Sequence, residues 1–132
     1  RIFLITGDGE LAEGSNWEAA LAAAHYGLDN LVIINDKNNL QLAGPTREIM
    51  NTDPLAEKWL AFGMQVTECQ GNDMASVVAT LEGLKQQGKP NVVIAHTTKG
   101  AGISFIQGRA EWHHRVPKGD EIEQALKELK DA

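Results

Sequence analysis

The chain has 132 residues, a formal net charge of -6, and 42% hydrophobic residues. This length fits one domain or part of one, and the hydrophobic share is large enough for a buried core. Lys and Arg are scattered along an acidic chain, which argues against nucleic acid as a partner. No apolar run approaches the roughly 20 residues that cross a membrane. The single cysteine, Cys69, excludes an internal disulfide and suits a cytoplasmic location.

Strand-like and helix-like segments alternate from the start of the chain. Residues 2–5 are wholly apolar and predict a buried strand that ends in a tight loop. A helix is expected from Ser15 to Tyr26, because Ser15 and Glu18 have the spacing of a capping box and Gly27 supplies a stop. A second buried strand and a polar loop follow, over residues 31–34 and 35–44.

The alternation continues through the second half of the chain. Asp53, before a proline, predicts a helix N-cap, and Gly63 predicts the end of that helix. A last helix is expected to be capped by Asp120 with Glu123. The elements expected in between are a helix to residue 62, a weaker strand over 65–68, a helix over 73–87 and a strand over 92–95.

Wholly apolar strands that alternate with amphipathic helices predict an α/β fold, a mostly parallel sheet with helices on both faces. Ligands of such sheets bind beyond the carboxyl ends of the strands. The loops after Ile5, Ile34 and Ala95 should therefore converge on one site. Because Arg1 leads directly into the first strand, we expect residues 1–132 to be a single domain that is a fragment of a longer protein.

The first two of these loops carry the groups that bind metal and phosphate. The loop after the first strand places Asp8 between two glycines, and the loop after the second reads NDKNNL from residue 35 to residue 40. Glycines let the backbone approach a phosphate closely while Asp8 faces a hard cation. A Gly-Asp-Gly turn alone is common, but an Asn-rich loop one strand–helix–strand unit later favours a shared Mg²⁺ and diphosphate site.

The Gly-Asp-Gly loop and the later Asn-Asn pair match the thiamine diphosphate fingerprint, and the run GDGELAEGSNWEA resembles its transketolase version. The resemblance covers about residues 1–117 and implies the thiamine-diphosphate-binding fold. It implies that Asp8 and Asn38 give side-chain oxygens, and Leu40 its carbonyl oxygen, to Mg²⁺ or to Ca²⁺ in its place. The backbone at Gly9 would lie against the diphosphate of the cofactor.

A later stretch, TTKGAG from Thr97 followed by Trp112 and His113, resembles the transketolase segment that reaches cofactor and substrate. The resemblance implies that Lys99 contacts the cofactor and that His113 is the active-site histidine. A lysine offers positive charge to a diphosphate, and a histidine can donate to a developing oxyanion. The family usually has glycine after this histidine, whereas here it is His114, so either imidazole could face the site.

Glu13 and Glu18 match transketolase acids that lie at the dimer interface and are thought to relay protons between active sites. A role in the capping box explains Glu18 equally well. The position of Glu13 between loop glycines favours a functional role.

The resemblance implies a cytoplasmic transketolase of the pentose phosphate pathway, which moves a glycolaldehyde unit from a ketose phosphate to an aldose phosphate. The family glutamate that activates the cofactor belongs to a pyrimidine-binding domain or subunit, which is not found in these 132 residues. We therefore expect a dimer, or an assembly of split subunits, whose site forms at an interface. The isolated chain is expected to be inactive.

Three other readings stay open. The same fingerprint occurs in 1-deoxyxylulose-5-phosphate synthase and in the α subunit of 2-oxo acid dehydrogenases, although the latter usually carries His-Gly-His-Ser where this chain has Thr-Thr-Lys-Gly. A non-catalytic binding domain could keep the fold. A nucleotide-binding domain is disfavoured because no Gly-x-Gly-x-x-Gly follows the first strand.

Overall fold

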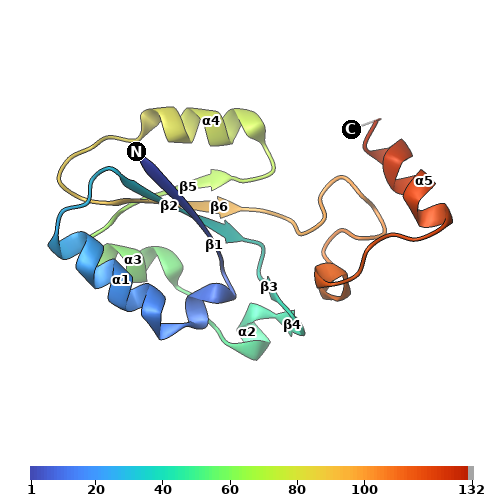
Figure 1. The fold of residues 1–132 in the computed structure, drawn as a ribbon, viewed down its shortest axis with the longest axis horizontal. Helices are drawn as coiled ribbons and strands as arrows, with labels where there is room; N and C mark the ends of the chain where they lie inside the picture. The colour runs from blue at the N-terminus through green and yellow to red at the C-terminus, as the bar shows by residue number, and fades with distance from the viewer. Residues whose placement is uncertain (131–132) are drawn as a thin grey trace.

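The computed structural model describes residues 1–130, and its centre is a four-stranded sheet in which all strands are parallel (Figure 1). The strand order β1-β2-β6-β5 confirms the predicted parallel α/β fold. Because the last strand inserts beside β2, the ends of β1, β2 and β6 are neighbours. The strands are β1 (Ile2–Gly7), β2 (Leu31–Lys37), β5 (Gln65–Gln70) and β6 (Asn91–His96).

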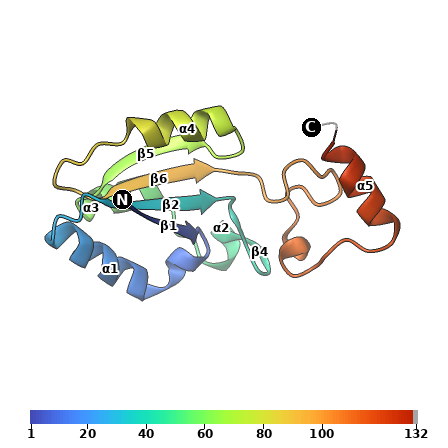
Figure 2. The same cartoon turned by 45° about the horizontal axis from the view of Figure 1, so that its top comes forward.

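Helices cover both faces of the sheet, as predicted: α1 and α3 lie on one face and α4 on the other (Figure 1, Figure 2). Successive side chains of the central strands point to opposite faces of the sheet. Ile33 and Ile94 therefore pack towards α1 and α3, and Val32 and Val93 pack towards α4. None of the helices within residues 1–130 is both long and apolar enough to cross a bilayer. The helices are α1 (Gly14–His25), α3 (Leu55–Ala61) and α4 (Met74–Gly83).

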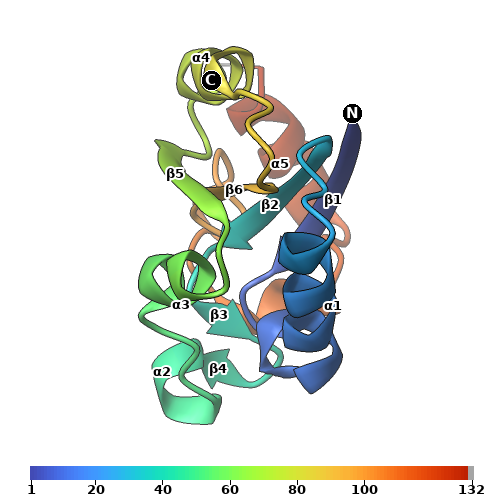
Figure 3. The same cartoon turned by 90° about the vertical axis from the view of Figure 1, so that its left-hand side faces the viewer.

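The first strand is not buried, contrary to the prediction from its apolar sequence. It lies at the margin of the sheet (Figure 3), where Ile5 is 71% exposed and Ile2 is 60% exposed. Within the described part of the chain β1 pairs with β2 alone. An apolar run shows that a strand tolerates burial, but the elements packed around it decide whether it is buried.

The predicted capping box at Ser15 and Glu18 is absent. Helix α1 starts one residue before Ser15, and its N-cap residue, Glu13, makes no side-chain cap bond. Asp53 is not the N-cap residue of α3, which is Pro54, and its carboxylate pairs with the amino group of Lys37. At Asp53 a tertiary ion pair takes the carboxylate, whereas at Ser15 the helix simply begins one residue earlier than the capping-box spacing implies.

The glycine stops are confirmed, whereas two helix bounds differ from the prediction. Gly27 and Gly63 follow α1 and α3 with φ of 60° and 88°, a conformation that favours glycine. Helix α4 ends at Gly83, whereas the sequence predicted it to reach residue 87. Helix α5 (Asp120–Glu128) starts at Asp120, which therefore lies in the first turn and does not cap it.

Two segments expected to be loops contain short elements. The residues after β2 form a two-stranded antiparallel hairpin and then a short helix. The segment after β6 extends away from the sheet and carries α5 at its end (Figure 2). These short elements are η1 (Glu10–Ala12), β3 (Leu40–Gln41), β4 (Gly44–Pro45), α2 (Thr46–Ile49) and η2 (Ala110–His113).

A buried polar network joins β1, β2 and α3 next to the carboxyl ends of the strands. Asn35 is 0% exposed; its amide group donates to the Thr6 hydroxyl and accepts from the indole N–H of Trp59 at 2.7 Å. Because buried polar groups are costly without partners, these bonds define how the three elements pack. The network lies directly behind the strand ends that carry Asp8 and Asp36.

Candidate cofactor site

A cavity of about 540 Å³ lies beyond the carboxyl ends of β1, β2 and β6, where the parallel sheet predicts a site. Its volume is in the range of about 300–1,000 Å³ that small-molecule sites occupy. The lining includes all the residues that the sequence predicted to bind cofactor or metal: Asp8, Gly9, Asn38, Leu40, Lys99 and His113.

Asp8 is buried in this cavity, with 2% of its surface exposed. Its Oδ2 atom accepts a hydrogen bond from the backbone N–H of Asn39 at 2.6 Å. Burial raises the pKa of Asp8, and the backbone bonds from Asn39 and Gly9 and the charge of Lys37 oppose that rise. Asp8 forms no salt bridge with any side chain of residues 1–130. A cation bound beside it would supply the missing counter-charge.

The loop after β2 turns back towards Asp8. Asn39 has a φ of 61°, a left-handed conformation that Asn tolerates better than most residues. The Oδ1 atom of Asn38 accepts from the Leu40 N–H at 2.9 Å, which closes a local turn. This turn brings Asn38 and Leu40 to the same cavity as Asp8, so the predicted metal ligands lie together.

Gly9 permits a close approach between the loop after β1 and the β3–β4 hairpin. A Cβ atom at this position would lie 2.7 Å from Cγ of Gln41, so any side chain here would force Gln41 to shift. The Glu10 carboxylate accepts from the Gly7 N–H at 3.2 Å and steadies the same loop. Gly7, Asp8 and Gly9 all line the cavity, and contact between the Gly9 backbone and a diphosphate stays a prediction.

Lys99 and His113 line the cavity from the segment that follows β6. The Nζ atom of Lys99 lies 3.4 Å from Nδ1 of His113. A lysine ammonium only donates, so Nδ1 accepts and Nε2 carries the ring proton in this arrangement. The imidazole can then offer its Nε2–H to an oxygen atom in the cavity.

A buried tryptophan anchors the short helix that carries His113. Trp112 packs against Phe105, with ring centroids 5.4 Å apart, and the Arg115 guanidinium lies 4.1 Å from its ring centroid. Both histidines are exposed, but only His113 lines the cavity and His114 does not. The geometry therefore favours His113 as the histidine that faces the site.

Glu13 and Glu18 do not line the cavity. Both are exposed near the start of α1. Their predicted relay across an interface between subunits stays a prediction.

The donors of the cavity fit thiamine diphosphate with a hard cation. No group of three or more His, Cys, Asp or Glu residues within residues 1–130 could hold a metal ion. The carboxylate of Asp8, the amide of Asn38 and the carbonyl of Leu40 are instead the oxygen donors that Mg²⁺ and Ca²⁺ prefer, and they leave positions for phosphate oxygens. Lys99 lines the same cavity and would supply positive charge to a phosphate bound there.

Sequence reasoning missed part of the lining. Asp36 lines the cavity, and its place at the end of a buried strand, two residues before Asn38, was a signal that could have found it. Leu42 and Ile49 add an apolar wall from the hairpin and α2. Such short elements have no periodicity from which this wall could be predicted.

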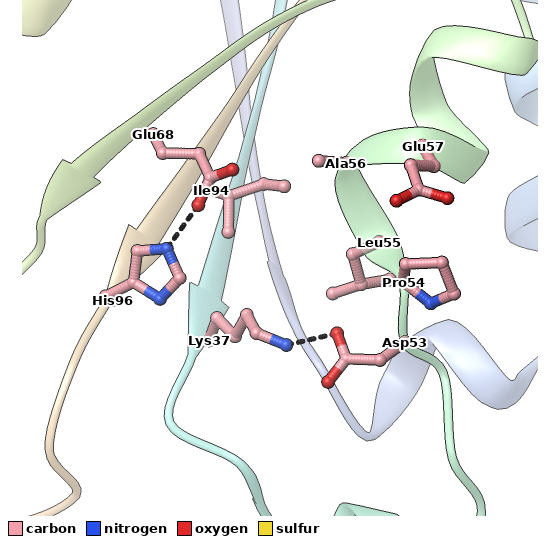
Figure 4. Close-up of a pocket in the computed structure, with 9 residues that line it drawn as sticks. All are labelled: Lys37, Asp53, Pro54, Leu55, Ala56, Glu57, Glu68, Ile94 and His96. Carbon is pink, nitrogen blue, oxygen red and sulfur yellow. Dashed lines mark hydrogen bonds and ion pairs between the residues drawn. The ribbon is translucent and has the colours of Figure 1, made fainter.

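A second cavity, of about 290 Å³, lies on the α3 side of the sheet (Figure 4). It contains the Lys37–Asp53 pair, and His96 Nε2 lies 2.5 Å from Oε2 of Glu68. The hydrogen bond from Lys37 lowers the pKa of Asp53. Asp36 and Lys37 are adjacent in the chain but line different cavities, because side chains of a strand alternate between its faces.

Residues 1–130 match the model of a family described as transketolase, thiamine diphosphate binding domain. The chain is 72% identical over 131 residues to an apulose-4-phosphate transketolase subunit of Actinobacillus succinogenes, a match that covers 99% of this chain and 48% of the relative. It is 39% identical over 129 residues to the 6-deoxy-6-sulfo-D-fructose transketolase subunit SqwG of a Clostridium species, covering 97% and 47%. The chain thus spans about half the length of these relatives.

Solved structures agree with the sequence comparisons. Transketolase from Campylobacter jejuni superposes with a TM-score of 0.89 at 30% identity, over 98% of this chain and 20% of that one. Transketolase from Pichia stipitis, in a complex with sedoheptulose-7-phosphate, gives 0.88 at 29% identity, over 97% and 19%. With the cavity residues in place at the strand ends, the chain belongs to the transketolase family, and its residues 1–130 match the thiamine diphosphate binding domain of that family.

Proposed function

We propose that the chain binds thiamine diphosphate through Mg²⁺ and forms the diphosphate-binding part of a transketolase that transfers a glycolaldehyde unit from a ketose phosphate to an aldose phosphate. The observation that carries this proposal is the convergence of Asp8, Asn38, Lys99 and His113 on one cavity. When bound, thiamine diphosphate supplies the nucleophilic carbon that attacks the ketose carbonyl.

The residues of the chain would hold and orient the reacting groups. Asp8 and Asn38, with the carbonyl of Leu40, would hold the cation, whose charge compensates the buried carboxylate. Lys99 would neutralise phosphate charge from the segment that follows β6. His113 accepts from Lys99 through Nδ1, so its Nε2–H would donate to a substrate oxygen on which negative charge develops.

A partner subunit completes the proposed site. Two relatives are named as subunits of an apulose-4-phosphate transketolase, and the chain spans about half of each. Glu13 and Glu18 are exposed beside the Gly-Asp-Gly loop, where a partner could contact them. We propose an assembly of split subunits, itself dimeric, in which the partner binds the pyrimidine end of the cofactor, and we expect no turnover by the isolated chain. The name of the relative at 72% identity makes apulose 4-phosphate the first donor to assay.

Calorimetry on the native assembly tests the proposal. The unmodified protein should bind thiamine diphosphate only when Mg²⁺ is present. Asp8→Asn should weaken binding by more than about 100-fold, because even indirect partners of a metal ligand cost 10- to 100-fold. Asp53→Asn, in the second cavity, is the matched control and should change the affinity less than about 3-fold. Magnesium-independent binding, or equal losses in both variants, would contradict the proposed role of Asp8.

A further inference from the structure

The cofactor cavity consists of two halves that come from different strands. Asp8 and Asn38 follow β1 and β2, whereas Lys99 follows β6. Strands β2 and β6 pair in parallel as far as their last residues, Lys37 and His96, and the loops that carry Asn38 and Lys99 begin just beyond that pair. A contact between the loop after β2 and the loop after β6 would therefore fix how far Lys99 lies from the proposed cation ligands Asp8 and Asn38.

Asp36 makes such a contact. Its Oδ1 atom accepts from the hydroxyl of Thr97, the first residue after β6, and its Oδ2 atom lies 3.5 Å from Nδ2 of Asn38, at the outer limit of a hydrogen bond. The Thr97 N–H also donates to the Lys37 carbonyl at 3.1 Å. Asp36 forms no salt bridge in the described part of the chain. Its half-buried carboxylate therefore serves as an acceptor between two loops.

We infer that Asp36 is a positioning residue for the bound cofactor, an inference that rests on the proposed function. By taking the amide nitrogen of Asn38, it leaves the amide oxygen for the Leu40 N–H and for a cation. By taking the Thr97 hydroxyl, it holds the chain two residues before Lys99. Indirect partners of this kind typically change metal affinity by 10- to 100-fold when they are removed.

Two substitutions of Thr97 distinguish the contribution of its hydroxyl group to cofactor affinity from that of its methyl group. Thr97→Val keeps the shape and removes the bond to Asp36, whereas Thr97→Ser keeps the hydroxyl and removes only a methyl group. In the native assembly, Thr97→Val should weaken thiamine diphosphate binding at fixed Mg²⁺ by about 10-fold. Thr97→Ser should stay within about 3-fold of the unmodified protein. Calorimetry gives the affinities, and the melting temperature without ligand reports any general loss of structure.

Asp36→Asn tests the other side of the contact. An asparagine oxygen can still accept from Thr97, but its NH₂ group would then oppose the NH₂ group of Asn38. We expect a loss of about 10-fold in affinity. Without the Thr97 hydroxyl, the introduced amide is free to turn its oxygen towards the NH₂ group of Asn38, so the double variant with Thr97→Val should lose less than the product of the single losses.

Several outcomes would overturn the inference. If Thr97→Val binds as tightly as the unmodified protein, or if Thr97→Ser loses as much affinity as Thr97→Val, the hydroxyl has no role in cofactor binding. Equal drops in melting temperature with unchanged affinity would make the contact structural only. If the unmodified assembly shows no Mg²⁺-dependent binding, the proposed function fails first and the inference with it.

Discussion

The two cavities near the ends of β2 and β6 use charged side chains in opposite ways. In the larger one, Asp8 is buried and forms no salt bridge within residues 1–130. In the smaller one, Lys37 pairs with Asp53 and His96 with Glu68 (Figure 4). A buried charge without a partner raises the free energy of the folded chain until a ligand compensates it. The comparison therefore separates a cavity suited to a ligand from one whose ion pairs join elements of the fold.

The pKa values of the two aspartates express the same difference. Burial raises the pKa of Asp8, whereas the bond from Lys37 lowers the pKa of Asp53. As pH rises, ionisation of Asp8 should therefore lower the free energy of unfolding, whereas ionisation of Asp53 should raise it.

The largest expected effect concerns the buried hydrogen-bond network of Asn35, Thr6 and Trp59. Asn35→Ala removes two buried hydrogen bonds and leaves the indole N–H of Trp59 without a partner, so the free energy of unfolding should fall by about 3 kcal/mol. Urea denaturation measures this change. Asn38→Ala is the control: it should cost less than about 1 kcal/mol, because Asn38 is only half-buried and its side-chain bonds are local. Similar losses in both variants would show that the network has no special structural role.

The next effect compares the lysines of the two cavities. Lys99→Met should weaken thiamine diphosphate binding by roughly 30-fold, since a hydrogen bond to a charged group contributes about 2 kcal/mol. Lys37→Met should leave the affinity within about 3-fold, because Lys37 is engaged by Asp53. Calorimetry on the native assembly measures both. A larger loss for Lys37→Met would mean that the second cavity also contributes to cofactor binding.

A smaller effect is expected from Asp8→Asn without metal. Because folding raises the pKa of Asp8, its contribution to stability is complete below the ordinary value of 3.8 and is lost as pH rises through the folded-state pKa. The variant should thus be more stable than the unmodified chain at pH 7, and the gain should vanish near pH 3.8. Unfolding free energies across this range provide the measurement. A variant that is less stable at pH 7 would exclude a charge penalty at Asp8.

The smallest effect is expected from Asp53→Asn, and its sign is reversed. The lowered pKa of Asp53 means that its contribution is present above 3.8 and is lost as pH falls through the folded-state pKa. At pH 7 the variant should lose at most about 1 kcal/mol, because the Asp53 side chain is 48% exposed and water screens the pair. The loss should also shrink in high salt. A loss unchanged by both pH and salt would point to packing rather than charge.

The strand ends were the most predictable part of the molecule. The loops after the three apolar strands could be assigned to one site because parallel strands end at the same edge. Asn38 and Lys99 were picked out within those loops by the resemblance to transketolases, and both line the cavity. The caps predicted at Ser15 and Asp53 were wrong, because a cap depends on where the chain enters the helix and on competing partners. No local pattern marks such competition.

The sequence by itself determined the alternation of strands and helices, the glycine stops and which loops meet at the carboxyl edge of the sheet. These features depend on periodicity and spacing, which are local properties of the chain. Only the tertiary structure decided that β1 lies exposed at an edge, that Lys37 pairs with Asp53, and that Asp36 contacts Thr97. Each of these depends on residues far apart in sequence, whose distance is set only when the strands have assembled.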